Sequence, residues 1–347
     1  MKTTIKQSRI EPTKNRSETK DDLSTDLENW MTNLPQQLRE TPLIKLTIPG
    51  SHDSFTASIT SSSDIAPDAD DVLKKFEFLG PLIKYFMANW SRTQTYMAAE
   101  QLNRGIRYFD LRIGTKKGTE ELYIVHGLYS DSVRSVLDEI GQFLDSHPGE
   151  IVILDCQHFY GLQQEDHERL MEMLKEQFST KLLPYSDSMD FMTLEYLTTR
   201  NHYQVICIYR SDAARFNQSL LWPSASFPTP WPNKISAVEL FQALDNGLEK
   251  RSPNFAYISQ CILTPSAWFI LKHLFSNLKE KCAVDFDNDR LEWISRQSPG
   301  DGGANIIITD YIELSDCQCV RDVINLNREL MKSRVLDTIK FVSEVEK

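Results

Sequence analysis

The feature that most constrains the fold is a regular alternation of short apolar runs with amphipathic helical patterns, which begins near Leu34. In segments such as 133–144 and 170–178, apolar residues recur every three or four positions, which is typical of helices. Strands that are apolar on both faces and separated by helices indicate a parallel sheet covered by helices. The runs are Leu43–Ile48, Ile106–Ile113, Leu122–Val125, Glu150–Cys156, Tyr203–Tyr209, Phe255–Leu263 and Asn305–Thr309, and an eighth strand is expected between residues 215 and 300.

The alternation extends over residues 35–345 without a Gly/Ser-rich or Pro-rich linker and without a repeat of fixed period. It therefore predicts a single α/β domain, a distorted TIM-type (β/α) barrel. Residues 1–25 are polar and are predicted to form a flexible tail. Two insertions, 56–95 and 222–234, interrupt the alternation, and we expect both at one rim of the barrel.

Composition excludes several classes of protein. The chain has 347 residues, of which 41% are hydrophobic, and its formal net charge is −11, so neither a fully disordered chain nor a nucleic-acid partner is expected. No apolar run reaches the ~18 to 20 residues of a membrane span, and the first twenty residues do not resemble a signal peptide. The six cysteines lack the spacing of a zinc site. These observations predict a reduced, cytoplasmic protein without a metal or cofactor.

Ionisable side chains stand at or directly after the predicted strands. In a β/α barrel the carboxyl ends of the strands meet at one mouth, where such enzymes keep their active sites. Burying so many polar groups unpaired in a structural role would be costly, so their joint placement indicates a functional site. The residues, in chain order, are His52, Asp53, Asp110, Arg112, His126, Asp155, His158, Arg210 and Asp310.

Two histidines and an arginine at one mouth favour phosphoryl transfer by acid-base catalysis. One imidazole can remove a proton from the attacking hydroxyl while the other donates a proton to the leaving oxygen. The guanidinium of Arg112 can bind phosphate oxygens in a bidentate manner and keeps its positive charge. The residues therefore predict a phosphodiesterase that needs no metal.

Four sequence blocks resemble the X domain of phosphatidylinositol-specific phospholipases C. They are Ile48–Phe55, Gly105–Arg112, Val125–Gly127 and Val152–Asp155, and they occur in the family's order. The chain is more closely similar to the small animal PI-PLC X domain-containing proteins, which have the catalytic barrel without the regulatory domains of the large signalling enzymes. The resemblance implies a role in lipid degradation and signal transduction, with cleavage of a phosphoinositide to diacylglycerol and a cyclic inositol phosphate.

The resemblance also implies catalytic roles for five residues. His52 corresponds to the general base, and Asp310 to the carboxylate that orients it. His126 corresponds to the general acid, and Asp53 to the carboxylate that supports the acid step. Arg112 stands where bacterial enzymes have an arginine and where the large eukaryotic enzymes have a calcium-binding carboxylate, so no catalytic calcium is expected.

The resemblance identifies the substrate-binding residues less completely than the catalytic ones. Asp110, His158 and Arg210 are the candidate substrate-binding residues, with His158 at the place of a bacterial lysine. His158 either lines the pocket or packs against the aromatic residues that follow it.

The insertions suggest how such an enzyme reaches lipid. An apolar stripe over residues 73–90 is expected either to lie at a membrane interface or to pack against the barrel. The segment 222–232, with a tryptophan at Trp222 and at Trp231, is either a rim loop with membrane anchors or a rigid connection. Transient membrane contact is the resulting expectation.

Two other functions fit the same residues. One is a metal-dependent glycerophosphodiester phosphodiesterase, which also pairs two histidines but surrounds them with carboxylates, and Arg112 opposes it. The other is a phosphoinositide-binding or adaptor protein that has kept the pocket without useful turnover. A bound stoichiometric metal would favour the former, and lipid binding without diacylglycerol release the latter.

Overall fold

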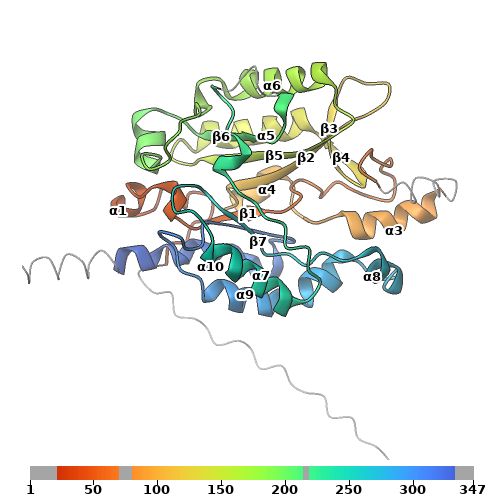
Figure 1. Ribbon diagram of the computed structural model, residues 1–347. Coiled ribbons are helices and arrows are strands. Elements are labelled where there is room, and N and C mark those ends of the chain that lie inside the picture. The colour runs from red at the N-terminus through yellow and green to blue at the C-terminus, as the bar shows by residue number, and fades with distance from the viewer. Residues whose placement is uncertain (1–21, 70–79, 214–218, 333–347) are drawn as a thin grey trace, which may run out of the picture.

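A computed structural model describes residues 22–69, 80–213 and 219–332 of the chain, and its centre is one sheet with helices on both sides (Figure 1). Buried side chains of the strands form the largest core cluster. The strands are β1 (Ile48–Ser51), β2 (Tyr108–Thr115), β3 (Leu122–His126), β4 (Leu128–Ser132), β5 (Val152–Tyr160), β6 (Val205–Tyr209), β7 (Ile258–Gln260) and β8 (Ile306–Thr309).

The strand pairing confirms a distorted barrel. β1 lies between β2 and β8 in parallel register, β5 joins β2 to β6, and β7 pairs with β8. No ladder between β6 and β7 is present in the described part of the chain, so the barrel is open at that point. β3 pairs with β2 and with β4 in antiparallel fashion, which the prediction of a parallel sheet did not include.

Helices cover the sheet on opposite sides. α5 and α6 lie on one side, and α7, α9 and α10 lie on the other, whereas α3 and α8 stand together at one end (Figure 1). None of the helices in the described ranges is long and apolar enough to cross a bilayer. Their bounds are α1 (Gln36–Arg39), α3 (Pro81–Ser91), α4 (Ala98–Asn103), α5 (Val133–Ser146), α6 (Gln164–Phe178), α7 (Ala237–Glu249), α8 (Ala267–Lys272), α9 (Asp287–Ser295) and α10 (Leu314–Leu326).

The first strand begins later than its apolar run predicts. Residues Leu43–Lys45 form a 3₁₀ turn, and β1 starts at Ile48 and includes Pro49 and Gly50. A Cβ atom on Gly50 would lie 2.8 Å from Ile308 and 2.9 Å from Tyr108, on the two neighbouring strands. Glycine therefore allows β1 to pack between them, and the strand delivers His52 directly at its end.

The expected eighth strand between residues 215 and 300 is absent from the described residues 219–300, which contain only β7. The additional strand is β4, which forms a hairpin with β3. Gly127 joins these two strands with a φ of +69°, a conformation that favours glycine. The sequence reading missed β4 because its polar residues do not form an apolar run.

Part of the predicted tail contacts the barrel. The backbone N–H of Leu23 donates to Asn325 Oδ1 at 3.0 Å, and Ser24 is buried. Residues 22–25 of the predicted tail thus belong to the described domain, and the rest of the predicted tail, residues 1–21, lies outside the described residues. Residues 73–79 of the predicted apolar stripe also lie outside them.

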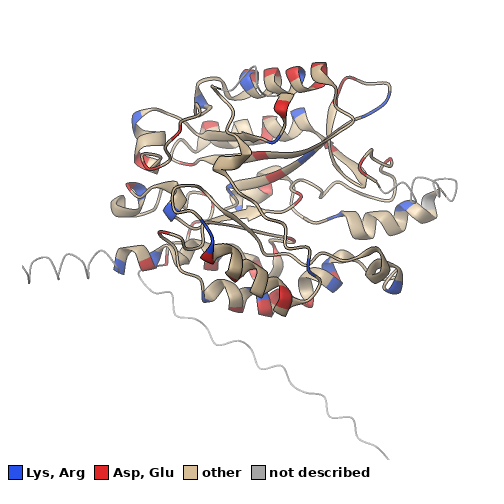
Figure 2. Ribbon diagram, in the orientation of Figure 1, with Lys and Arg blue, Asp and Glu red and all other residues tan. Residues whose placement is uncertain are grey.

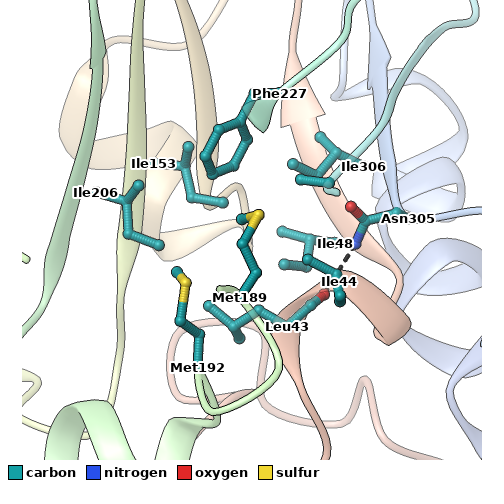
Figure 3. A pocket seen from close by; sticks show the side chains of 11 residues that line it. Leu43, Ile44, Ile48, Ile153, Met189, Met192, Ile206, Phe227, Asn305 and Ile306 are labelled. Carbon is teal, nitrogen blue, oxygen red and sulfur yellow. Dashed lines mark hydrogen bonds between the residues drawn. The ribbon is translucent and has the colours of Figure 1, made fainter. Parts of the chain in front are cut away.

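A small apolar cavity lies at the opposite end of the barrel from the predicted mouth (Figure 3). Ile48 and Ile306, the first residues of β1 and β8, line it together with Ile153 and Ile206. The one polar side chain in its lining, Asn305, donates to the carbonyls of Leu43 and Leu46 at 2.9 and 2.7 Å. This cavity therefore belongs to the packed core.

A buried ion pair lies at the end of the barrel where the strands begin. Arg107 and Glu150 are fully buried, with guanidinium–carboxylate distances of 3.0 and 2.8 Å. Glu150 also accepts the backbone N–H and hydroxyl of Thr32 at 2.7 and 2.6 Å. Glu150→Gln is expected to lower the free energy of unfolding by about 3 to 5 kcal/mol, because it leaves a buried guanidinium without its counter-charge.

Chemical denaturation of the variant and the wild type measures this loss. The control is Glu176→Gln, which removes a carboxylate from an exposed pair with Arg134 at 3.9 Å and is expected to change stability by less than about 1 kcal/mol. Equal effects of the two substitutions would contradict a structural role for the buried pair.

Candidate active site

His52 lies at the end of β1 and contacts carboxylates through both ring nitrogens. Nδ1–H donates to Asp310 Oδ1 at 2.8 Å, and Asp310 directly follows β8, the parallel neighbour of β1. Nε2 lies 3.4 Å from Asp53 Oδ2 and 3.9 Å from Asp110 Oδ2. The strand pairing thus brings together two residues that are 258 positions apart in the sequence.

Asp53 occupies the turn after β1 and is the centre of the cluster. Its φ of 39° lies in the left-handed region, and its N–H donates to Asp110 Oδ2 at 3.2 Å. Its Oδ1 forms an ion pair with Arg112 Nε, and its Oδ2 lies 3.2 Å from His126 Nε2. One buried carboxylate therefore faces both imidazoles and the guanidinium.

His126 ends β3, just before the hairpin turn at Gly127. Its Nδ1–H donates to the backbone carbonyl of Ser91 at 2.6 Å, and its Nε2 faces Asp53. Both ring nitrogens face acceptors, so a proton on either nitrogen has a partner. About a quarter of the side chain is exposed, against a tenth for His52, so His126 is the more accessible imidazole.

The charges around His52 favour its protonated form. Burial alone would lower the pKa of His52, but the carboxylates of Asp53, Asp310 and Asp110 together outweigh burial and raise it to about 9. The free protein therefore carries a charged His52 near neutral pH.

The two central carboxylates have opposite shifts. Burial would raise the pKa of Asp53, but the positive charge of Arg112, followed by those of His126 and His52, holds this pKa well below its usual range. Burial and the charge of Asp53 raise the pKa of Asp110. Asp53 is thus ionised at moderate pH values.

The other candidate residues lie on β5 and after β6. His158 is paired in register with Arg112, and burial together with the charge of that guanidinium lowers the pKa of His158. Arg210 forms two hydrogen bonds of 2.7 Å with Asp155, which also accepts from Tyr108 Oη at 2.5 Å. Arg210 is therefore tied to a buried carboxylate, a contact that strand-end position alone does not reveal.

Three side chains could hold a metal ion. His52, Asp53 and Asp110 offer ligand atoms that lie within 4.8 Å of one another. However, Arg112 and His126 already face the Asp53 carboxylate. A divalent cation bound there would lie beside a fixed guanidinium that competes for the same carboxylate, so the residues fit a metal poorly.

Sequence reasoning missed the groups that support this cluster. Ser91 is the last residue of α3, and Gln94 lies between α3 and α4. Arg290, on α9, donates to the backbone carbonyl of Asp310 at 2.8 Å. None of these residues follows a strand. No signal in a single sequence distinguishes them from ordinary helix and loop residues.

Comparison with known proteins decides the family. The model of the phosphatidylinositol-specific phospholipase C X domain matches residues 83–202. The human PI-PLC X domain-containing protein 3 is 39% identical over 305 residues, which cover 87% of this chain and 94% of the relative. The chain belongs to the PI-PLC X domain-containing protein family. The human PI-PLC X domain-containing protein 1 is 33% identical over 88% of this chain and 93% of its own length.

Solved structures confirm the fold of this family member. A phosphatidylinositol-specific phospholipase C of Staphylococcus aureus superposes with a TM-score of 0.60 at 17% identity, covering 88% of this chain and 99% of that one. The enzyme of Listeria monocytogenes gives a TM-score of 0.58 at 19% identity, with 87% and 99% coverage. The predicted family and the predicted distorted barrel are both confirmed.

Proposed function

We propose that this protein is a phospholipase C that cleaves phosphatidylinositol-type lipids without a metal. The observation that carries the proposal is that the Nε2 atoms of His52 and His126 face the same Asp53 oxygen, while Arg112 binds the other oxygen. Two imidazoles and a fixed cation at one buried carboxylate suit an acid, a base and an anion-binding group around one phosphodiester.

The proposed reaction breaks the bond between phosphorus and the glycerol oxygen. His52, held by Asp310, takes the proton of the inositol 2-hydroxyl, and that oxygen attacks phosphorus. His126 gives its proton to the departing diacylglycerol oxygen, and Arg112 stabilises the charge on the phosphoryl oxygens. The products are diacylglycerol and a cyclic inositol phosphate. His158 and Arg210, with Asp110, are proposed to bind the inositol hydroxyls.

Incubation of the purified protein with phosphatidylinositol vesicles, with EDTA or with added calcium, tests the proposal. Equal diacylglycerol release under both conditions and a cyclic inositol phosphate are expected. Loss of activity with EDTA, together with a stoichiometric metal in the protein, would favour the metal-dependent phosphodiesterase. Tight vesicle binding without any diacylglycerol would favour a binding protein.

The raised pKa of His52 predicts a pH dependence. A base must be neutral to accept a proton, so below a pKa of about 9 the neutral fraction of His52 increases about tenfold per pH unit. We expect kcat/KM to rise from pH 6 toward pH 8. Asp310→Asn removes one carboxylate that raises this pKa, so the rising limb is expected at lower pH, with a lower maximum. A limb that does not move in this variant would contradict the assignment of His52 as the base.

We also propose that the protein contacts the membrane through α3 and α8. Their ribbons are mainly uncharged (Figure 2), and Trp90 on α3 packs against Phe269 on α8. The exposed apolar side chains of this surface, which we call the α3–α8 surface, are Leu82, Tyr85, Trp268, Leu271 and Phe275. Phe275 is 92% exposed and Trp268 75% exposed. Because α3 ends at Ser91, which binds His126, the surface adjoins the active site.

Trp268→Ser with Phe275→Ser tests this contact. Vesicle binding in a sedimentation assay and activity on vesicles are expected to fall at least tenfold, because each aromatic side chain loses burial in lipid worth roughly 2 kcal/mol. Activity on a monomeric short-chain phosphatidylinositol is expected to stay the same. Val238→Ser, a change at a 77% exposed position on α7, is the control. Unchanged vesicle binding would contradict the proposal.

The remaining expectations concern membrane anchors in the rim loop, residues 222–232, and the redox state of the cysteines. Trp222 is fully buried, so it packs in the core, whereas Trp231 is exposed. Of the two alternatives for this loop, the membrane-anchor alternative is therefore wrong for Trp222. All six cysteines are free and buried, which supports our proposal of a reducing, cytoplasmic location.

A further inference from the structure

Residues 91–95, which we call the 91–95 strap, connect three active-site turns. The Ser91 carbonyl accepts from His126, and Thr93 Oγ1 donates to the carbonyl of Asp53 at 2.8 Å. The carbonyl of Thr93 accepts the N–H of Tyr311, the residue after Asp310, at 2.8 Å. One short segment is thus attached to the turns that follow β1, β3 and β8.

Gln94 makes the central contacts of the strap. Its side chain is fully buried, and its Nε2 donates to the carbonyls of His52 and Thr309 at 3.0 and 2.9 Å. The parallel register of β1 and β8 ends at the pair Ser51 and Thr309. The amide of Gln94 therefore bridges the two chains at the point where regular pairing stops.

Both chains turn sharply beyond this bridge. Asp53 has a φ of 39° and Tyr311 a φ of 49°, both in the left-handed region that non-glycine residues seldom adopt. The His52 N–H donates to the Thr309 carbonyl at 3.1 Å, and the next carbonyl on the β1 side, that of His52, accepts from Gln94. Beyond the hydrogen bond of His52 N–H with the Thr309 carbonyl, the side chain of Gln94 therefore takes the place of strand pairing between the two diverging segments.

We propose that Gln94 is a positioning residue, which holds His52 and Asp310 at hydrogen-bonding distance by bridging the ends of β1 and β8. The buried amide would contact no substrate and would act through these two backbone carbonyls and through the N–H of Ile312, which Gln94 Oε1 accepts at 3.4 Å. Its loss leaves Thr93, which contacts Asp53 and Tyr311, as the remaining bridge of the strap between the two chains, and the contact of His52 Nδ1 with Asp310 lengthens. The catalytic consequence rests on the proposed function, but the geometric one does not.

Gln94→Met, which keeps the shape of the side chain and removes its donors, tests the proposal. We expect kcat to fall at least about tenfold, less than the ~10² to 10⁴ fold for removal of the base itself, with KM changed less than twofold. The control is Gln204→Met, a buried glutamine that donates to three backbone carbonyls, of Leu144, His147 and Glu150, away from the site. It is expected to lose stability but to keep the wild-type kcat.

Titration of His52 by histidine side-chain NMR gives a readout that does not depend on turnover. The charged groups facing its ring are Asp53 on the β1 turn, Asp110 on β2 and Asp310 after β8. If Asp310 moves away, the pKa of His52 falls in Gln94→Met and stays unchanged in Gln204→Met. Should Gln94→Met not fold, Gln94→Asn, whose shorter amide cannot reach both carbonyls, is expected to cause the same fall.

Two outcomes separate the proposals. A folded Gln94 variant with the wild-type His52 titration would overturn the positioning role. A wild type that releases no diacylglycerol, while the Gln94 variant lowers the pKa of His52, would overturn the proposed function and support the positioning role.

Discussion

His52→Asn and His126→Asn are each expected to lower kcat on phosphatidylinositol by about 10² to 10⁴ fold, the usual contribution of a positioned acid or base. Asparagine keeps a donor near the place of Nδ1, so the contacts with Asp310 and with the Ser91 carbonyl have a substitute. It provides no group that can exchange a proton near neutral pH. The loss is therefore chemical, and the fold should persist.

His202→Asn is the matched control for this pair. His202 is exposed and has a φ of 60°, a conformation in which asparagine is well tolerated. The activity and stability of the His202→Asn variant are expected to equal those of the wild type. The double variant His52→Asn with His126→Asn should lose little more than the poorer single variant, because the two groups act in one step. Wild-type turnover in either single variant would exclude the proposed mechanism.

Most strand ends of the barrel were predictable because each apolar run marks a strand in the sequence. The apolar runs that end near His52 and His126, and the run that contains Asp110, are visible in the sequence. The parallel pairing of β1 with β2 brings His52 and Asp110 together, whereas His126 reaches the same site from β3, which runs antiparallel to β2. The contact of His52 with Asp310 follows from the pairing of β1 with β8. No local pattern encodes that pairing, so without the family resemblance Asp310 would only have been one strand-end carboxylate among several.

The supporting groups were not predictable in this way. Gln94 and Ser91 act through backbone carbonyls, and a hydrogen bond of this kind leaves no trace in residue spacing. The ion pair of Arg210 with Asp155 illustrates the same limit, because the sequence places both residues at strand ends but not against each other. Strand β4 was missed since its pairing depends on the turn at Gly127 rather than on apolar periodicity.

In the proposed mechanism, Arg112 stabilises the phosphate charge in place of a metal. Its Nε is bound to Asp53, and its guanidinium also interacts with Tyr160, so in the proposed mechanism these two contacts orient it toward the phosphate oxygens. The contact with Asp53 holds this carboxylate in its charged form, facing both histidines. The proposed role of Arg112 is therefore twofold, because it binds the substrate phosphate and also keeps the carboxylate between the imidazoles charged.

Arg112→Met is accordingly expected to lower kcat by about 10² to 10³ fold, the loss for removal of one transition-state donor. The pKa of Asp53 should also rise, because burial raises it once the guanidinium no longer opposes burial. Protonation of Asp53 then adds a loss of kcat at acid pH that the wild type lacks. Arg39→Met, which breaks a half-buried pair with Glu195 at 3.8 Å, is the control and should keep full activity. A pH–rate profile of all three proteins measures both effects, and an Arg112→Met enzyme within threefold of the wild type would show that this guanidinium does not carry the phosphate charge.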